Sequence, residues 1–397
     1  MLSKTENELL TRVGPGAPAG ELLRRYWHPV AVAGELTAEK PKKRVKVMGE
    51  HLVLFRDGQG RYGLIGEQCS HRAASLYYGT IEEDGIRCAY HGWKYAVNGK
   101  CLEQPFEPKG STYKDEICHL AYPVEKLAGL LFAYLGPKPA PLLPRWDLLV
   151  REDGVRKIMV LPVHKCNWLQ TMENSVDPVH TYYLHGHQLK VRDLPGGEYY
   201  YRPIGKLEFE EVRGPVWAGV IKKRTYEGED PEAESGHPLL FPNMLYAPQG
   251  PDLVIHWRVP IDDTHTYVVW VTFRPSEDGR KVKQPENPPV EYLPSMMTPE
   301  GEYEMTSFPS HDMMAWETQG PIFDRTKENL GTSDKGITIY RKLLREQIKV
   351  VQDGGEPLGV IRDPEKNKII ELAVSRGMAR KEYVDSRSEY YHGRRAG

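Results

Sequence analysis

Two short motifs, each with one cysteine and one histidine, place the strongest constraint on the fold of this chain. A C-x-H motif runs from Cys69 to His71, a C-x-x-H motif runs from Cys88 to His91, and 16 residues separate them. Each motif lies between strand-like segments, so two loops can present one cysteine and one histidine each to a common centre. Zinc sites, the alternative, generally group cysteines on one knuckle and histidines on another. The mixed pairs fit a [2Fe–2S] cluster in which one iron takes two thiolates and the other takes two imidazoles.

Residues 41–145 are predicted to form an all-β domain around these loops. The segment RVKVMGEHLVLFRDGQGRYGLI alternates apolar and polar residues and has a hairpin signal at Asp57-Gly58. A second signal of the same kind, Asn98-Gly99, lies in YAVNGK. Short strands joined by tight turns are therefore expected on both sides of the cysteine–histidine motifs.

A proline-rich segment marks the end of this domain. Four prolines in GPKPAPLLP at 136–144 predict a linker, because proline cannot occupy a helix interior or a central strand. We expect residues 1–40 to form an N-terminal segment that packs on a catalytic domain formed by residues 146–397. The tail after residue 380 is polar and basic, and we expect it to be frayed.

The second domain is predicted to mix helices and strands, which makes the whole chain an α+β protein. The pattern of residues 163–186 predicts a helix, and the pattern of residues 195–275 predicts strands. The pattern of residues 311–352 predicts a helix with an interruption near GTSDKG. Within that segment, Ser333 or Asp334 can cap the helix that follows. No internal repeat is apparent.

A second group of candidate ligands lies in the segment MENSVDPVHTYYLH, which contains Asn174, Asp177, His180 and His185. On a regular helix Asp177 and His180 lie about 60° apart, whereas His180 and His185 lie about 140° apart, too far for one metal ion. Pro178 removes a backbone donor, so we expect a broken or overwound helix around the histidines. Two histidines and one carboxylate form the facial triad of non-haem iron(II) oxygenases.

Composition excludes several other classes of protein. The formal charge of −2 argues against a nucleic-acid-binding protein, which would carry a basic excess. A mean hydropathy of −0.56 and the lack of a long apolar run argue against a membrane span, and MLSKTENELL lacks the apolar core of a secretory signal, so we expect a cytoplasmic location. Cys101, Cys118 and Cys166 have no histidine partners and are interpreted as packing residues.

Together, the two groups of ligands resemble the oxygenase components of Rieske non-haem iron oxygenases, in particular the phthalate 4,5-dioxygenase-like branch. The resemblance covers the chain from residue 24 to about residue 350 and is carried by RRYWHPVA, CAYHGWKY, CNWLQTMENSVDPVHTYYLH and WETQGPIFDRTKENLGTSDKGI. It implies an all-β Rieske [2Fe–2S] domain and a helix-grip (START/Bet v 1-like) catalytic domain with a curved antiparallel sheet. It also implies a head-to-tail homotrimer.

The resemblance further implies which residues hold the metals. Cys69, His71, Cys88 and His91 would hold the cluster. His180 and His185 would hold the mononuclear iron together with an aspartate further along the chain. In the family, a glutamate lies five residues after that aspartate. Asp312, with Glu317 after it, matches that pattern, and Asp324 is the rival.

Two further residues are expected to act in catalysis, Asn174 and Asp177. The resemblance implies that Asp177 bridges His91 of one subunit and His180 of the next by hydrogen bonds. The alternative is that Asp177 only caps a helix N-terminus, as aspartate before proline commonly does. His187 is expected to lie outside the ligand set.

The predicted activity is the insertion of oxygen from O2 into an aromatic substrate, with or without a carboxylate. No GxGxxG motif follows a strand, so electrons from NAD(P)H must come through a separate reductase with flavin and ferredoxin-type centres. The alternative is monooxygenation, such as O- or N-demethylation of an aromatic ether or alkaloid-like compound. The alternative from a different class of protein is a Rieske protein that only transfers electrons. The run Lys222-Lys223-Arg224 could bind an acid group, but we favour a solvated strand.

Overall fold

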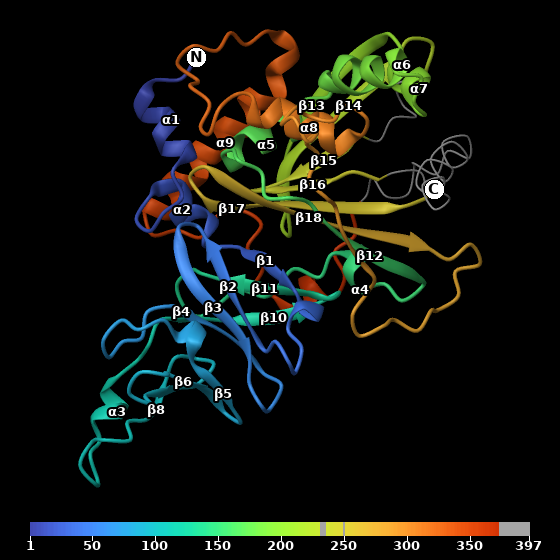
Figure 1. The fold of residues 1–397 in the computed structure, drawn as a ribbon. Helices are drawn as coiled ribbons and strands as arrows, with labels where there is room; N and C mark the ends of the chain where they lie inside the picture. The colour runs from blue at the N-terminus through green and yellow to red at the C-terminus, as the bar shows by residue number, and fades with distance from the viewer. Residues whose placement is uncertain (231–235, 249–250, 373–397) are drawn as a thin grey trace.

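Four β-sheets form the framework of the described part of the chain (Figure 1). The structure is a computed structural model that describes residues 1–230, 236–248 and 251–372; the tail after residue 380 lies outside them. Two four-stranded sheets, ordered β2-β3-β4-β9 and β5-β6-β7-β8, lie at the lower end in Figure 1. Their strands are β2 (Lys42–Val47), β3 (Glu50–Arg56), β4 (Tyr62–Gly66), β5 (Thr80–Glu82), β6 (Gly85–Arg87), β7 (Lys94–Tyr95), β8 (Cys101–Glu103) and β9 (Ala121–Tyr122).

Tight turns join these strands at the two positions that the sequence predicts. In the turn between β3 and β4, the carboxylate of Asp57 accepts a hydrogen bond from the backbone amide of Arg61 at 2.9 Å. The turn between β7 and β8 contains Gly99 at φ +86°, a backbone conformation that glycine adopts without strain. The strands and turns predicted for this region are confirmed, and one short helix, α3 (Tyr113–Glu116), lies among them.

A three-stranded sheet, ordered β1-β11-β10, connects the small sheets to the large one. Its strands are β1 (Trp27–Val32), β10 (Val124–Leu127) and β11 (Leu130–Tyr134). Both β1 and β2 contact strand β17 (Leu253–Asp262) of the large sheet, and the rings of Phe132 and Trp257 meet edge to face with centroids 5.7 Å apart. The N-terminal segment therefore supplies one strand to this layer, while its helices α1 (Lys4–Thr11) and α2 (Pro18–Leu23) contact the helix α9 (Lys335–Gln352).

The large sheet has eight strands in the order β13-β14-β15-β16-β17-β18-β12-β19. All neighbours are antiparallel except β12 and β19, which are parallel. The strands are β12 (Gly154–Val160), β13 (Ile204–Arg213), β14 (Ala218–Tyr226), β15 (His237–Leu240), β16 (Met244–Tyr246), β17 (Leu253–Asp262), β18 (His265–Pro275) and β19 (Val290–Tyr292). The α+β fold class is confirmed.

Helices cover the upper face of this sheet in Figure 1, where α5 contacts β17 and α9 contacts β14. The α-helices after α2 are α3 (Tyr113–Glu116), α4 (Asp147–Val150), α5 (Trp168–Val176), α6 (Gln188–Val191), α7 (Gly197–Tyr200), α8 (Phe308–Glu317) and α9 (Lys335–Gln352). A π-helix spans Thr181–His187, and short 3-10 turns span Ala33–Glu35, Leu76–Tyr78, Thr332–Asp334 and Pro364–Asn367. None of the helices in the described ranges has both the length and the apolar composition needed to cross a bilayer.

The structure refines three of the predicted elements. The helix expected over 163–186 is two helices with a break between them, and the strand-like region from residue 195 begins with α7 before β13. The interruption expected near GTSDKG is longer, because α8 ends before Gly320 at φ +90° and Pro321, neither of which suits a continuing helix. Asp334 precedes α9 as expected, but its carboxylate bonds to the amide of Gly331 at 2.7 Å instead of to the helix.

Candidate metal centres

The two cysteine–histidine loops share one backbone geometry. The amide of Ala73 donates to the carbonyl of Cys69 at 2.8 Å, and the amide of Gly92 donates to the carbonyl of Cys88 at 3.1 Å. The donor in each loop stands four residues after the cysteine and has a positive φ, +59° for Ala73 and +73° for Gly92. Both loops therefore turn back sharply after the cysteine, and each brings its histidine round to the same side.

The side chains on these loops fit a [2Fe–2S] cluster. The rings of His71 and His91 lie 4.6 Å apart, and the ring of His71 stacks on Trp93 at 4.5 Å. The Nδ1 atoms of both histidines are buried and have no hydrogen-bond partner in the described residues. Cys69 and Cys88 are 3% and 4% exposed, and their thiols interact. Two unpartnered imidazole nitrogens beside two buried sulfurs are the mixed donor set that such a cluster requires.

The thiol environment would favour the protonated form of Cys69 in the absence of a metal ion. Burial raises the pKa of the Cys69 thiol, so a thiolate ligand at this position would depend on the positive charge of a bound metal ion. The hydroxyl of Tyr95 lies 3.2 Å from the Sγ of Cys69. Of the remaining cysteines, Cys101 and Cys166 are fully buried packing residues as predicted, but Cys118 is exposed, so the packing interpretation is wrong for it.

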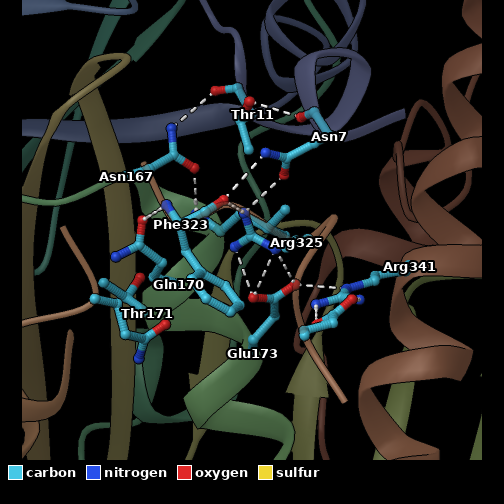
Figure 2. A network of polar contacts seen from close by, with 12 residues as sticks. Asn7, Thr11, Asn167, Gln170, Thr171, Glu173, Phe323, Arg325 and Arg341 are labelled. Carbon is cyan, nitrogen blue, oxygen red and sulfur yellow. Dashed lines mark hydrogen bonds and ion pairs between the residues drawn. The ribbon is translucent and has the colours of Figure 1, made fainter. Parts of the chain in front are cut away.

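A stripe of polar side chains fixes helix α5, which leads into the second centre (Figure 2). Its members recur every three residues, at 167, 170 and 173, and so lie close to one face of the helix. Asn167 donates to the carbonyls of Thr11 and Asp263, Gln170 donates to those of Trp316 and Gly320, and Glu173 accepts from Arg325 and Arg341. These bonds tie α5 to α1, to the end of α8 and to α9.

The helix breaks where the sequence predicts a distortion. Asp177 ends α5 in an extended conformation, as expected for a residue before proline, and Pro178 follows. The carboxylate of Asp177 then accepts hydrogen bonds from the amides of Val179 at 2.7 Å and His180 at 3.3 Å, which caps the next helical segment. That segment continues as the π-helix Thr181–His187, which is wider than an α-helix. The helix is therefore broken, as expected, but not overwound.

This distortion brings His180 and His185 together with Asp312 of α8. The Oδ1 atom of Asp312 lies 3.3 Å from Nε2 of His185 and 3.9 Å from Nε2 of His180. One ligand atom from each of the three residues falls within 4.8 Å of the others. The Oδ1 atom of Asp312 is buried and has no hydrogen-bond partner in the described residues. Two imidazoles and one carboxylate that converge in this way suit a non-haem ferrous ion.

The charge states also suit metal binding. Burial lowers the pKa of His185 to about 4, so its ring is neutral and able to act as a ligand. Burial by itself raises the pKa of Asp312, but the neighbouring His185 and His180 outweigh it and hold the pKa below its usual value. His311 and Phe308, which the sequence did not single out, orient His185: Nδ1 of His311 lies 3.2 Å from Nδ1 of His185, and the ring of Phe308 packs at 4.4 Å.

The other residues named from the sequence lie outside this group. Asp324 is on the surface and pairs with Lys327 at 3.1 Å, so the structure brings Asp312 and not Asp324 to the histidines. The ring of His187 packs against Tyr201 at 5.1 Å. Asn174 is half-buried near the end of α5, where its carbonyl accepts the amide hydrogen bond of the residue that ends the helix.

The solvated-strand interpretation of the run 222–224 is wrong for Lys222. Its side chain is buried, and its Nζ donates to the carbonyl of Ser175 at the end of α5. Burial lowers its pKa to about 7. Arg224 donates to the carbonyl of Pro178 at 3.0 Å and to the hydroxyl of Thr181. Both cations therefore hold the backbone around the histidines.

Comparisons with known proteins agree with these two centres. Residues 26–117 match the family model described as Rieske [2Fe-2S] domain, and residues 292–387 match the model described as LigXa C-terminal domain like. The oxygenase subunit of 5,5'-dehydrodivanillate O-demethylase from a Sphingobium species is 42% identical over 96% of this chain and 90% of its own length. Phenoxybenzoate dioxygenase subunit alpha from Ectopseudomonas oleovorans is 38% identical over 88% of this chain and 87% of its own length. The phthalate 4,5-dioxygenase oxygenase subunit from Pseudomonas putida is 30% identical over 90% of this chain and 89% of its own length.

Solved structures with the same fold include NdmA from Pseudomonas putida with caffeine, at a TM-score of 0.63 and 19% identity over 87% of this chain and 97% of the other. The oxygenase of carbazole 1,9a-dioxygenase in complex with ferredoxin matches at a TM-score of 0.62 and 22% identity over 88% of this chain and 96% of the other.

The chain belongs to the Rieske non-haem iron oxygenases, as an oxygenase component. It is an oxidoreductase that uses a [2Fe–2S] cluster, non-haem iron(II) and electrons from a partner reductase.

Proposed function

We propose that this chain oxidises an aromatic substrate with O2 at a ferrous ion held by His180, His185 and Asp312. The single observation that carries the proposal is the convergence of those three ligand atoms within 4.8 Å. Cys69, His71, Cys88 and His91 would hold the cluster. When bound, the cluster stores single electrons and the ferrous ion supplies the redox chemistry that reduces dioxygen.

The protein's own part in this reaction is to orient the ligands and to exclude water. The carboxylate Oδ2 of Asp177 lies 3.5 Å from Nδ1 of His180, which supports a tautomer with the proton on Nδ1 and a free Nε2 directed to the metal. His311 supports the same arrangement for His185. Apolar side chains near α8, among them Met313 and Trp316, are buried and would keep the reacting centre dry.

Electrons would come from a separate flavin and ferredoxin-type reductase and pass between subunits. In this proposal the chain forms a head-to-tail homotrimer, and Asp177 bridges His91 of one subunit and His180 of the next. The burial of Asp177, its ionised state and its contact with His180 support this role. Burial opposes the negative charge, but the hydrogen bond to His180 outweighs it and lowers the pKa of Asp177. Asn174 would support Asp177 from the same helix end. A cytoplasmic location belongs to the same proposal.

Ring dioxygenation is the leading outcome, and O-demethylation is the second candidate. The relative at 42% identity is named an O-demethylase, while the relatives at 38% and 30% are named dioxygenases. Both outcomes use the same two metal centres, and the position of the substrate carbon relative to the iron decides between them.

Metal analysis and product analysis test the proposal together. The purified chain should contain about three irons and two labile sulfides, two irons in the cluster and one at the mononuclear site. With a reductase, NADH and O2, a panel of aromatic acids, aromatic methyl ethers and N-methyl compounds should yield a cis-diol, a phenol or formaldehyde. A protein that holds the cluster but never binds a lone ferrous ion would overturn the proposal.

A further inference from the structure

One buried arginine in the large sheet lacks the acceptors that the other buried arginines have. Five arginines are buried in the described part of the chain: Arg24, Arg156, Arg258, Arg325 and Arg341. Arg24 pairs with Glu50 at 2.6 Å, Arg325 and Arg341 pair with Glu173, and Arg156 donates to Gln284 at 2.6 Å and to two carbonyls. Arg258, only 2% exposed, has no carboxylate within 4.0 Å among the described residues. Its Nε and Nη1 atoms are buried and have no hydrogen-bond partner in the part of the chain that the structure describes.

The position of Arg258 in β17 places it on the metal side of the sheet. Neighbours in a strand alternate between the two faces, so Arg258 shares a face with His256 and lies opposite Trp257. Trp257 packs toward the three-stranded sheet, as its contact with Phe132 shows. The guanidinium of Arg258 instead lies over the ring of Trp316, 5.0 Å from its centroid.

Trp316 connects this guanidinium to the mononuclear site. It lies on α8 four residues after Asp312, and residues four apart share a face of a helix. Asp312 and Arg258 are close enough that each changes the pKa of the other. The guanidinium therefore packs against the helix that carries Asp312, and the two charged groups form no ion pair.

His256 adds a second unpartnered polar atom at the same place. Its Nδ1 lies 3.4 Å from Nη2 of Arg258 and faces a donor, which assigns the proton to Nε2. That Nε2 is buried and has no partner in the described residues. The ring is fixed by stacking on Trp270 at 4.0 Å. Val254 and Met313 belong to the apolar cluster on this side of the sheet.

Two other cations near the metal site already have acceptors. Lys222 and Arg224 donate to backbone carbonyls around the iron-ligand segment, as described above. A buried guanidinium with two nitrogens that lack acceptors among the described residues is unfavourable, so a ligand that supplies a planar anion would relieve it. A carboxylate offers the two parallel oxygens that a guanidinium binds, and the apolar surroundings suit an aromatic ring attached to it.

We propose that Arg258, with His256 beside it, anchors a carboxylate of the substrate, so that aromatic acids are the substrate class of this enzyme. This inference rests on the proposed function for its location and deepens it by naming the group that is recognised. The rival role for Arg258 is to balance the charge of Asp312, which would affect iron binding instead of substrate choice.

The test measures binding and turnover separately in the holoenzyme loaded with cluster and ferrous ion. Benzoate, 3-methoxybenzoate and 4-phenoxybenzoate are compared with their carboxamides by equilibrium dialysis in the wild type, Arg258→Gln and Arg258→Lys. Arg274→Gln is the matched control, because Arg274 lies on the neighbouring strand β18 and pairs with Asp252 at the surface. Iron content, cluster absorbance and O2 uptake are recorded for every variant.

We expect the wild type and the Arg274→Gln control to bind at least one acid at least about 30-fold more tightly than its amide. Arg258→Gln should lose that preference with its iron content unchanged, and Arg258→Lys should keep part of it, because lysine retains the charge but not the planar fork. If Arg258→Gln fails to fold, the test compares the acid preference of the wild type with that of Arg258→Lys, which should be smaller.

Three results would overturn the inference: equal binding of acids and amides by the wild type, an acid preference that survives in Arg258→Gln, or loss of iron in that variant with the preference intact. Acid-selective binding that depends on Arg258, but without O2 uptake, would support the anchor and overturn the proposed oxygenase reaction. O2 uptake with neutral aromatic compounds alone would support the proposed oxygenase reaction and overturn the carboxylate anchor.

Discussion

The carboxylate of Asp177 contacts both the backbone and the side chain of His180. Its Oδ2 atom lies 3.3 Å from the amide nitrogen of His180 and 3.5 Å from Nδ1 of the ring. One carboxylate therefore starts the helical segment that carries the histidines and orients the first of them. The capping role, considered as an alternative from the sequence, and the contact with His180 occur together in the structure.

Asp177→Asn separates these two functions. The asparagine can still cap the helix through its side-chain oxygen, so both metals should remain bound. Loss of the negative charge should slow the arrival of electrons at the mononuclear site by about 10- to 100-fold, the usual effect of removing a group that supports a metal ligand. Stopped-flow absorbance of the reduced cluster, mixed with substrate and O2, measures this rate. Normal turnover by the variant would refute the bridging role.

Asp312→Ala should remove the mononuclear iron and leave the cluster intact. The carboxylate is one of the three ligands that we propose, and two neutral histidines alone would hold ferrous iron weakly. Iron content should fall from about three to about two per chain, with unchanged cluster absorbance. Asp324→Ala is the control, since that carboxylate lies on the surface next to Lys327, and it should keep the full iron content and activity. Loss of iron in Asp324→Ala but not in Asp312→Ala would show that Asp324, and not Asp312, is the iron ligand.

Tyr95→Phe should lower the reduction potential of the cluster. The hydroxyl of Tyr95 lies 3.2 Å from the Sγ of Cys69, and a hydrogen bond to a cluster sulfur favours the reduced form, which carries more negative charge. Loss of one such bond corresponds to a shift on the order of 50 mV for a one-electron couple. Redox titration followed by EPR measures it. Tyr122→Phe is the control, because that hydroxyl bonds to Glu50 at 2.7 Å, and its potential should not change.

The sequence predicted the ligand loops and the turns because their chemistry is local. The spacing of Cys69 and His71, or of Asn98 and Gly99, is confined to a few residues, and each residue type restricts the backbone or the ligand on its own. The break at Pro178 was predicted for the same reason. Asp312 was located through resemblance to a family and not from spacing, since it lies more than a hundred residues from the histidines it approaches.

The features that the sequence did not predict depend on contacts between distant elements. The π-helix form of Thr181–His187 has no signal in the composition of this segment. Lys222 was interpreted as solvated because a lone strand with three cations resembles a surface strand, but α5 covers it. Arg258 carried a usable signal, a charge inside the apolar run LVIHWRV, although only the structure shows that two of its nitrogens lack acceptors among the described residues.

The buried ion network of Glu173 on α5 predicts an effect on the stability of the fold (Figure 2). Glu173 accepts hydrogen bonds from Arg325 at 2.7 Å and from Arg341. Arg325→Met removes one cation, leaves a buried carboxylate short of donors and should destabilise the fold by about 3 kcal/mol in urea titration. Arg213→Met, at a surface ion pair, is the control and should change stability by less than about 0.5 kcal/mol.

The same network predicts how stability depends on pH. Burial opposes the charge of Glu173, but the two arginines outweigh it and lower the pKa of Glu173 below its usual value. A carboxyl whose pKa is lower in the folded state stabilises the fold above its unfolded pKa and loses that contribution as pH falls through the folded pKa. Wild-type stability should therefore decline below about pH 4.5, and Glu173→Gln should show a shallower decline there. An equally steep acid decline in Glu173→Gln and the wild type would show that this carboxylate contributes nothing to it.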